Sequence, residues 1–377
     1  MSRTPAQRVT VSVPGKLILA GEYDVLKGGT ALAATVAPRL TVTLALADGH
    51  QGATHISSDL WTAPRYLRRD DPVSFYGHDE MLTAAVAVAL KTWNLPDLNV
   101  SVQSGFDVSS GFGSSSALRL AVLAAGKLLA HPDLNPSNTR ESMKESMLDC
   151  ARLAYSLQKA AQSGASGYDI ATQWLGGAVE FRCDTHASSD RWPLQADTLP
   201  LSALNQLNEN IHVFVGGAGA PTGKMMQSTM RWLDEAGSPD PLATCGLPAD
   251  SSIQRWDILR VLSRNLVDAM RTLMASDDHG NGQAIAAAAQ LRRFFSNSPA
   301  FPQKVADTLA GVSGLDRVWS WKTTGAGGED AIFLIGTKTN TREAKMKLIN
   351  SGWRHLENLF SEKSMCVDEV VNHKLLH

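Results

Sequence analysis

The chain has 377 residues, of which 44% are apolar and 19% charged, and its formal net charge is −2. This length predicts two domains, and the composition is that of a folded globular protein. The near-neutral charge excludes a global basic field for nucleic acid or an anionic membrane, whereas a few local lysines can still hold a small anion.

The four cysteines, at positions 150, 183, 245 and 366, are widely spaced and form no CxxC pair. This spacing argues against a disulfide framework or a zinc site and favours a reducing, cytoplasmic location. The N-terminal segment lacks the long apolar run of a signal peptide. The most apolar helix candidate, residues 117–130, is too short to span a bilayer. We therefore expect a cytoplasmic protein that does not enter a membrane.

Strands dominate the first third of the chain. The segment VTVSVPGKLILAGEYDVL, which starts at residue 9, is predicted to form two strands with a turn at Pro14-Gly15. Residues 31–36 and 40–46 are strand-like, residues 80–93 have helical spacing, and the following LNVSVQS is strand-like again.

A glycine–serine turn, SGFGSSSAL at residues 110–118, then leads into an apolar helix that ends near residue 130. Asn138 and Glu141 resemble a capping box, which predicts a helix that runs to about residue 162. GAVEFR and IHVFVGG are strand-like, and the polar, irregular residues 184–209 lie between them. We place a domain boundary near residue 205, which gives domains at 1–205 and 206–377.

The second half is predicted to hold helices at residues 222–235, 253–275, 280–295 and 341–350. Strand-like VWSWKTT and AIFLIGT flank a second glycine cluster. Helices and strands do not alternate strictly, so the pattern favours an α+β fold over a doubly wound sheet.

The glycine–serine turn has the features of an anion-binding loop. The first N–H groups of a helix lack intrahelical partners, and the helix dipole places partial positive charge there. Gly111 and Gly113 would let a ligand approach the backbone, and Ser114, Ser115 and Ser116 add hydroxyls for phosphate oxygens or Mg²⁺. The alternative is a loop that only caps a buried helix.

Three further features extend this interpretation to phosphoryl transfer. Lys16 lies in PGKLILAGEYDVL, Asp169 lies in SGASGYDIATQWLGG, and KTTGAGGEDAIFLIG contains three glycines. A lysine, an isolated acid and two glycine-rich loops form a plausible set for moving a phosphoryl group.

Two other chemistries are disfavoured. In GAGAPTGKM, residues 217–225, Ala218 stands where a Walker P-loop needs its first glycine, and Met225 where it needs Ser or Thr. No GxSxG motif of a serine hydrolase occurs.

Together these stretches resemble the GHMP kinase superfamily, which phosphorylates small metabolites with ATP. PGKLILAGEYDVLKGGTAL is similar to its first motif, SGFGSSSAL to its second and TTGAGGEDAIFL to its third, in that order across residues 14–334. The resemblance implies a two-domain α+β fold with a ribosomal-protein-like N-terminal half and a ferredoxin-like C-terminal half. It also implies that the active site lies between them.

Within the superfamily, the phosphomevalonate kinase branch resembles this chain most. That branch tends to have tyrosine where mevalonate kinases have histidine, as in Gly21-Glu22-Tyr23, and its loop is similar to residues 165–169. The third motif departs from the usual pattern at Thr323, Thr324 and Glu329, and Glu329 adds a negative charge beside a loop that is expected to face an anionic substrate. The second motif lacks the usual preceding proline, and Phe112 replaces leucine.

The resemblance assigns roles to individual residues. The loop Gly111, Gly113, Ser114, Ser115 and Ser116 would bind ATP, with Ser115 on Mg²⁺ or the β-phosphate. Lys16 would neutralise charge on the transferring group. The candidate substrate-binding residues are Ser166, Lys224, Lys322, Gly325, Gly327 and Gly328. For Lys224 and Lys322 the alternative is a surface lysine, which the sequence favours. Trp174, Trp232, Trp319 and Trp321 are predicted to be core or interface residues.

Asp169 has two possible functions. If the acceptor is an alcohol, its carboxylate takes or orients the proton. If the acceptor is a phosphate monoester, whose second pKa is about 6, no base is needed and Asp169 orients Lys16 or the metal. A structural alternative is an N-cap for the helix that begins at IATQWL. Gln158 replaces the glutamate that helps to hold Mg²⁺ in mevalonate kinases, eleven residues before Asp169.

The expected activity is ATP- and Mg²⁺-dependent phosphorylation of a small anionic metabolite, with mevalonate 5-phosphate as the specific candidate. Mevalonate kinase is the nearest alternative. A diphosphomevalonate decarboxylase-like lyase is disfavoured because its longer lysine–tyrosine–tryptophan signature is missing, and a non-catalytic ligand sensor because Lys16, Ser115 and Asp169 are all present. We expect a monomer or homodimer that binds neither nucleic acid nor membrane.

Overall fold

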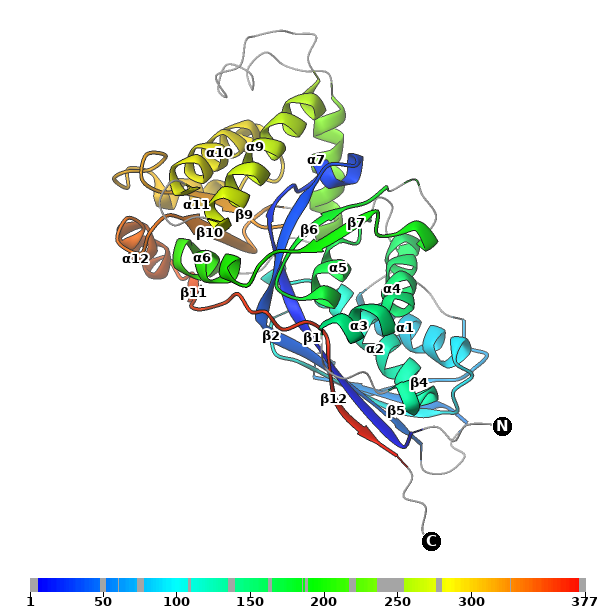
Figure 1. The fold of residues 1–377 in the computed structure, drawn as a ribbon. Coiled ribbons are helices and arrows are strands. Elements are labelled where there is room, and N and C mark those ends of the chain that lie inside the picture. Colours follow the sequence, from blue (N-terminus) through cyan, green and yellow to red (C-terminus); the bar gives the residue numbers. More distant parts are fainter. Residues whose placement is uncertain are drawn as a thin grey trace.

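The molecule consists of two mainly antiparallel sheets and the helices that cover them (Figure 1). The computed structural model describes residues 6–47, 52–59, 61–72, 78–107, 110–134, 140–161, 165–184, 186, 189–216, 222–235, 254–275, 280–325 and 327–372. The mixture of helices and strands is that of an α+β protein, as predicted.

The larger sheet has eight strands in the order β12-β1-β2-β5-β3-β4, with β6 paired to β2 and β7 to β6. All its pairs are antiparallel except the parallel pair of β3 and β5. Its strands are β1 (Arg8–Ala20), β2 (Ala31–Leu46), β3 (Thr54–Ser58), β4 (Arg65–Leu67), β5 (Leu98–Ser104), β6 (Ala178–Arg182), β7 (Gln195–Thr198) and β12 (Cys366–Val371).

One face of this sheet is covered by a group of helices (Figure 1). The apolar α2 lies against β1 and β2, and its side chains are buried almost without interruption from Ser116 to Leu129, which explains its Ala- and Leu-rich sequence. The group consists of α1 (His78–Thr92), α2 (Ser114–Ala130), α3 (Arg140–Ser146), α4 (Leu148–Ala161) and α5 (Tyr168–Leu175).

The smaller sheet has the order β11-β8-β10-β9, with all pairs antiparallel. Its strands are β8 (Ile211–Val215), β9 (Ser320–Thr323), β10 (Ala331–Ile335) and β11 (Arg354–Leu356). Helices α9 and α10 pack on each other and α10 on β9, whereas α9 also reaches β1. The helices of this part are α6 (Ser202–Asn210), α7 (Thr222–Asp234), α9 (Arg255–Ala275), α10 (Gly280–Phe294), α11 (Gln303–Leu309) and α12 (Arg342–Asn350).

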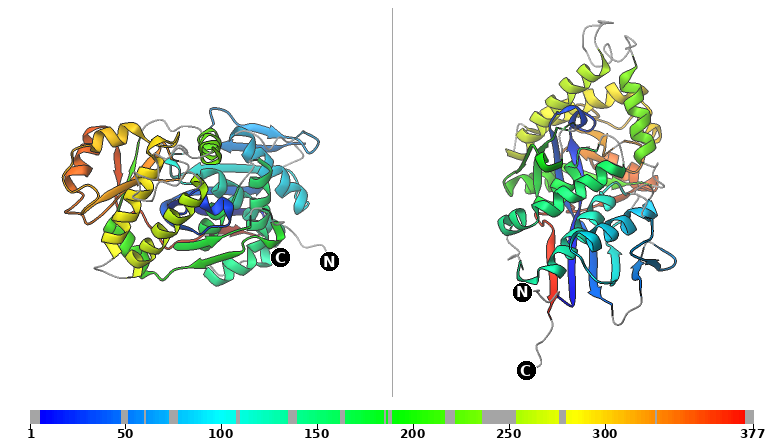
Figure 2. Two further views of the ribbon diagram at one scale, coloured as in Figure 1. Left: turned by 90° about the horizontal axis from the view of Figure 1, so that it is seen from above. Right: turned by 90° about the vertical axis from the view of Figure 1, so that its right-hand side faces the viewer.

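The C-terminal strand returns to the first sheet. β12 pairs antiparallel with β1, with Val371 opposite Arg8, so the last described residues lie beside the first ones (Figure 1). The view from above in Figure 2 shows the part containing α10–α12 beside the larger sheet. The boundary near residue 205 stays a prediction.

Two expectations about local structure were wrong. Pro14 and Gly15 do not form a turn: β1 runs through them with a shift of register against β2. A Cβ on Gly15 would lie 2.7 Å from Val36 Cγ2, so this glycine allows close packing between strands rather than a reversal. The long helix predicted up to residue 162 is broken at Met147 into α3 and α4, and Asn138 lies outside the described residues.

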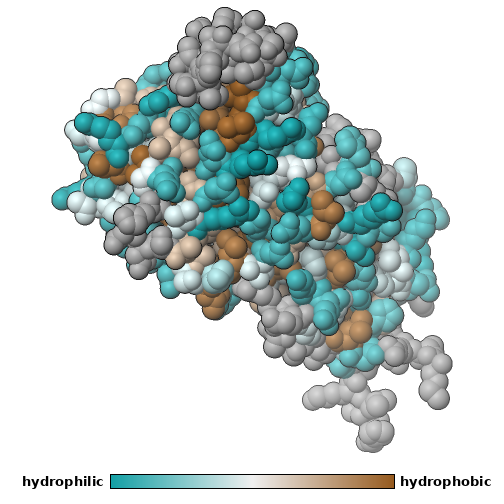
Figure 3. All heavy atoms as spheres, turned by 45° about the horizontal axis from the view of Figure 1, so that its top comes forward, coloured by the Kyte–Doolittle hydropathy of each residue, from teal (hydrophilic) through white to brown (hydrophobic). Residues whose placement is uncertain are grey.

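Several other elements were predicted closely, among them α2, β5, α7 and α10, whereas β7 and most of α6 lie within residues 184–209, which were expected to be irregular. The four tryptophans expected in the core are all buried, with Trp319 completely so. On the face drawn in Figure 3, hydrophobic residues form separate patches among hydrophilic ones. No helix in the described ranges has the length and apolar character needed to cross a membrane.

Candidate active site

Lys16 lies at the centre of the site, buried in β1 with 5% of its surface exposed. Its Nζ donates to the Gly111 carbonyl and to Tyr168 Oη, both at 3.1 Å. Its backbone N–H donates to the Phe112 carbonyl at 2.9 Å. Both ends of the residue therefore hold the glycine–serine loop against β1.

The charge of Lys16 is maintained in this buried place. Burial opposes the charged form, but Tyr168, Asp169 and Glu22 outweigh it and leave the pKa of Lys16 above its usual value. Burial also raises the pKa of Tyr168. Lys16 thus presents a positive charge at neutral pH, next to a phenol that stays protonated.

The glycine–serine loop has the backbone form of a phosphate cradle. Gly111 and Gly113 have φ angles of 71° and 76°, in the left-handed region that favours glycine. A Cβ on Gly113 would lie 2.9 Å from Lys16 Cε. Helix α2 starts directly after Gly113, so its first N–H groups and its partial positive charge face the lysine side of the loop.

The three serines of the loop are not equivalent. Ser116 is completely buried, and its Oγ donates to the Gly113 carbonyl at 2.9 Å, so this hydroxyl is used inside the first turn of α2. Ser114 and Ser115 are partly exposed and keep their hydroxyls within reach of a ligand. The structure therefore favours Ser114 and Ser115 over Ser116 as phosphate or metal contacts.

Asp169 is held by two hydrogen bonds near the start of α5. Its Oδ1 accepts the Ile170 N–H at 3.0 Å, and its Oδ2 accepts Gln158 Nε2 at 2.9 Å. The N-cap of α5 is Gly167, in the left-handed region, so the suggested N-cap role of Asp169 was wrong. Asp169 is 9% exposed, which leaves it buried but at the edge of the site.

Three residues of this cluster were not singled out from the sequence. Tyr168 bonds Lys16 directly, and Gln173 donates from Nε2 to the Gly113 carbonyl at 3.0 Å. Arg119 is buried on α2, where burial lowers its pKa while the charge of Asp169 raises it. Tyr168 is next to Asp169 in the sequence, and Arg119 is a charged residue in an otherwise apolar stretch one helical turn after Ser115. Gln173 gave no signal, because only the fold brings it to the loop.

The third motif approaches the second. A Cβ on Gly111 would lie 3.7 Å from Thr324 Oγ1, so the two loops are neighbours. Gly325, Gly327 and Gly328 have φ angles of 62°, 91° and 83°. The predicted glycine turn between β9 and β10 is therefore present, at the same place as the first two motifs.

Lys322 is not a surface residue, contrary to one of its two interpretations. It is 4% exposed, forms an ion pair with Glu22 and donates to the Thr323 carbonyl at 2.8 Å. This ion pair joins the smaller sheet to the segment after β1. The positive charge of Lys322, which was expected to bind a substrate phosphate, is thus partly balanced by Glu22.

The remaining candidates differ in exposure and in their partners. Lys224 is exposed in the first turn of α7. Ser166 is buried, and its carbonyl accepts Trp192 Nε1 at 3.0 Å. Glu329 pairs with the exposed Lys304 at 3.2 Å, so its negative charge is partly balanced outside the glycine turn.

A magnesium ion would have few protein ligands here. Among the described residues, no three His, Cys, Asp or Glu side chains come together to hold a metal. Gln158 Oε1 is nevertheless buried without a hydrogen-bond partner in the described part of the chain, on the side chain that holds Asp169. Such oxygens suit Mg²⁺, so Asp169, Gln158 and Ser115 fit an ion that is bound mainly through a nucleotide.

Comparison with known proteins identifies a family model. Residues 80–177, which include α2 and the whole of α5 with Asp169, match the GHMP kinases N terminal domain. A phosphomevalonate kinase of Streptomyces sp. (strain CL190) is 30% identical over 208 residues, which cover 49% of this chain and 52% of that protein. The mevalonate kinase of Mus musculus is 25% identical over 228 residues, covering 50% and 57%.

The fold matches over almost the whole chain. The phosphomevalonate kinase of Streptococcus pneumoniae, solved with phosphomevalonate and AMPPNP, superposes with a TM-score of 0.64 at 16% identity and covers 92% of this chain and 98% of that one. By sequence, the chain matches only about half the length of its curated relatives. These similarities extend the shared fold well beyond the part matched by sequence.

Proposed function

We propose that this chain is a member of the GHMP kinase superfamily and transfers the γ-phosphoryl group of ATP to a small anionic metabolite. The observation that supports this most is the buried cluster in which Lys16 Nζ contacts the glycine–serine loop and Tyr168, beside Asp169. A charged lysine enclosed by a helix N-terminus and a carboxylate is suited to a phosphoryl group in transfer.

The position of each residue suggests its role in the transfer. The first N–H groups of α2, with Ser114 and Ser115, would hold the phosphates of ATP. The acceptor oxygen would attack the γ-phosphorus as its bond to the bridging oxygen of ADP breaks. Lys16 would neutralise the charge that spreads over the equatorial oxygens, while Tyr168 and the Gly111 carbonyl fix its Nζ.

Asp169, Gln158 and Ser115 are the residues we assign to Mg²⁺. When bound, the ion supplies charge neutralisation on the phosphates of the nucleotide. The protein contributes the orientation, because Gln158 Nε2 fixes the Asp169 carboxylate and leaves Gln158 Oε1 available.

The specific substrate that we propose is mevalonate 5-phosphate, converted with ATP into mevalonate 5-diphosphate and ADP in isoprenoid synthesis. Two features support this: the similarity to the Streptomyces enzyme and the tyrosine of Gly21-Glu22-Tyr23. Tyr23 is buried against Phe295, with ring centroids 5.9 Å apart, on the wall of the hollow that also contains Lys322. A phosphate acceptor is mostly a dianion at neutral pH and needs no base.

Mevalonate kinase is the second candidate. The similarity to the mouse enzyme supports it, and the Asp169 carboxylate beside Lys16 would take the proton of an alcohol acceptor. A cytoplasmic location and a monomeric or dimeric state remain predictions.

The deciding experiment is ADP release by the purified chain with Mg-ATP and each of three acceptors. Turnover on mevalonate 5-phosphate without CO₂ would support the specific proposal. Turnover on mevalonate would keep the kinase and change the acceptor, and CO₂ from mevalonate 5-diphosphate would indicate a lyase. No turnover on any of the three would contradict the specific proposal.

A further inference from the structure

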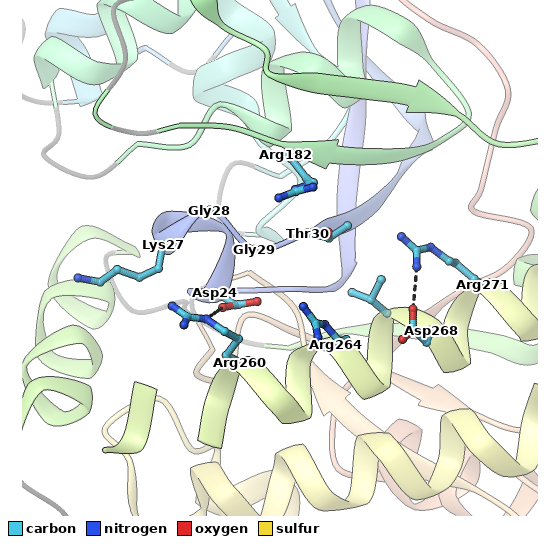
Figure 4. Close-up of a pocket in the computed structure, with 11 residues that line it drawn as sticks. Asp24, Lys27, Gly28, Gly29, Thr30, Arg182, Arg260, Arg264, Asp268 and Arg271 are labelled. Carbon is cyan, nitrogen blue, oxygen red and sulfur yellow. Dashed lines mark hydrogen bonds and ion pairs between the residues drawn. The ribbon is translucent and has the colours of Figure 1, made fainter. Parts of the chain in front are cut away.

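A second hollow lies on the other side of the segment that follows β1. Its volume is about 340 Å³, within the lower range of small-molecule pockets. The wall is formed by the end of β6, by the turn at residues 24–30 and by one face of α9 (Figure 4). It is lined by Asp24, Lys27, Gly28, Gly29, Thr30, Arg182, Arg260, Arg264, Val267, Asp268 and Arg271.

The lining is strongly basic, with five Lys or Arg side chains against two Asp. Arg271 is already engaged by Glu180 and Asp268, and Arg260 lies 3.8 Å from Asp24. Within the described residues, Arg182 and Arg264 form no ion pair and no side-chain hydrogen bond, although Arg264 is close enough to Asp24 to influence its pKa. The pocket therefore holds positive charge that the surrounding protein leaves unbalanced.

The arrangement of the free cations is suited to an anion. Figure 4 shows Arg264 rising from α9 and Arg182 coming from the opposite side, with the turn at Gly29 and Thr30 between them. Lys27 stacks on Trp256, with Nζ 5.0 Å from the ring centroid, and has no carboxylate partner in the described parts of the chain. Guanidinium groups present planar pairs of donors that match phosphate oxygens.

The carboxylate of Asp24 competes weakly for these cations. Its Oδ1 is buried without a hydrogen-bond partner among the described residues. Burial raises the pKa of Asp24, although Arg260 and Arg264 act in the opposite direction. A Cβ on Gly29 would lie 2.0 Å from Asp24 Oδ2, so the carboxylate is packed against the turn rather than turned fully toward the arginines.

This pocket is separate from the proposed active site but shares a wall with it. Glu22 and Tyr23 line the hollow beside Lys322, whereas the next residue, Asp24, lines the basic pocket. No residue of the Lys16, Asp169 and glycine–serine cluster lines the basic pocket.

We propose that the basic pocket is a second anion site that binds a small metabolite through a phosphate or diphosphate group, held by Arg182 and Arg264. The size of the pocket excludes a large polyanion from its interior and fits a single small molecule. The proposal goes beyond the phosphoryl-transfer reaction and does not depend on it.

The test is calorimetric titration of the full chain with inorganic pyrophosphate at constant ionic strength, with the nucleotide site filled by a non-hydrolysable ATP analogue. The test variant is Arg182→Gln/Arg264→Gln, whose two side chains are exposed at the pocket. The control is Arg317→Gln/Arg342→Gln, which removes the same charge from two other exposed positions.

We expect the test variant to bind pyrophosphate at least about 10-fold more weakly than the unmodified chain, with the control unchanged and analogue binding kept by all three. Failure of the unmodified chain to bind pyrophosphate, equal binding by the test variant, or equal weakening by the control would overturn the proposal. If the double variant does not fold, the single variants Arg182→Gln and Arg264→Gln give the same comparison. A chain without kinase activity can still pass this test, so the two proposals fail independently.

Discussion

Gln158 Nε2 donates a hydrogen bond of 2.9 Å to Asp169 Oδ2, while Gln158 Oε1 is buried without a partner in the described part of the chain. The Gln158 side chain therefore lies at the proposed metal site. Gln158 Nε2 orients the Asp169 carboxylate, and Gln158 Oε1 is left available as an oxygen ligand.

Replacement of Gln158 tests this role. Gln158→Leu should lower kcat about 10- to 100-fold and raise the Mg²⁺ concentration needed for half-maximal activity, because both the orienting donor and the oxygen are lost. Gln158→Glu should bring the Mg²⁺ requirement below that of the unmodified chain, since two adjacent carboxylates favour a cation. Equal Mg²⁺ titrations for all three proteins would contradict the assignment.

Lys16→Met should lower kcat about 100- to 1,000-fold, because it removes the charge that opposes the equatorial oxygens in transfer. Steady-state ADP release measures the loss, and nucleotide binding by calorimetry serves as the control. A variant that binds the nucleotide and retains nearly full kcat would exclude Lys16 from the chemistry.

Asp169→Asn separates the two acceptors. It should nearly abolish transfer to an alcohol, which needs a base, and leave measurable transfer to a phosphate monoester. The comparison uses mevalonate and mevalonate 5-phosphate with the same preparation. Loss of nucleotide binding together with loss of the folded state would show instead that Asp169 is structural.

The buried ion pair of Glu22 and Lys322 should matter more for stability than an exposed pair does. Lys322→Met leaves Glu22 buried without its partner and should lower the free energy of unfolding by about 3–5 kcal/mol. Lys304→Met breaks the pair of the 84% exposed Lys304 with Glu329 and should cost less than about 1 kcal/mol. Denaturant unfolding measures the free energy of unfolding of both variants. Equal losses for Lys322→Met and Lys304→Met would contradict this prediction.

His212 should make the folded state sensitive to acid. Burial and the charge of Lys345 lower its pKa from 6.5 to about 3, so the unfolded chain binds a proton over this interval and the folded chain does not. The contribution of His212 to stability is complete above pH 6.5. It is lost as the pH falls toward 3, by up to about 1.4 kcal/mol per pH unit.

The measurement is the free energy of unfolding at pH 7 and pH 5. His212→Gln should lose less stability between the two values than the unmodified chain, whereas the exposed His186→Gln should behave like the unmodified chain. Identical pH slopes for all three proteins would contradict the argument.

Much of the site could be predicted because its parts are local. The loop around Gly111 and Gly113 and the start of α2 depend on backbone preferences that neighbouring residues determine. Lys16 and Asp169 stood in recognisable motifs, although their contacts through Tyr168 come from the fold.

What could not be predicted depends on distant packing. Gly15 resembled a turn residue, but close contact with Val36 of the neighbouring strand explains it. Lys322 resembled a surface lysine because its partner Glu22 lies 300 residues earlier in the chain. The basic pocket could not be predicted either, because Arg182 and Arg264 belong to separate elements that only the fold brings together.

The most direct test of the account is ³¹P NMR of the chain with Mg-ATP and mevalonate 5-phosphate. The account predicts that signals of ADP and of a new diphosphate ester grow together in equal amounts, and that Lys16→Met slows both. Release of ADP with inorganic phosphate and no diphosphate ester, or no change in the spectrum, would contradict it.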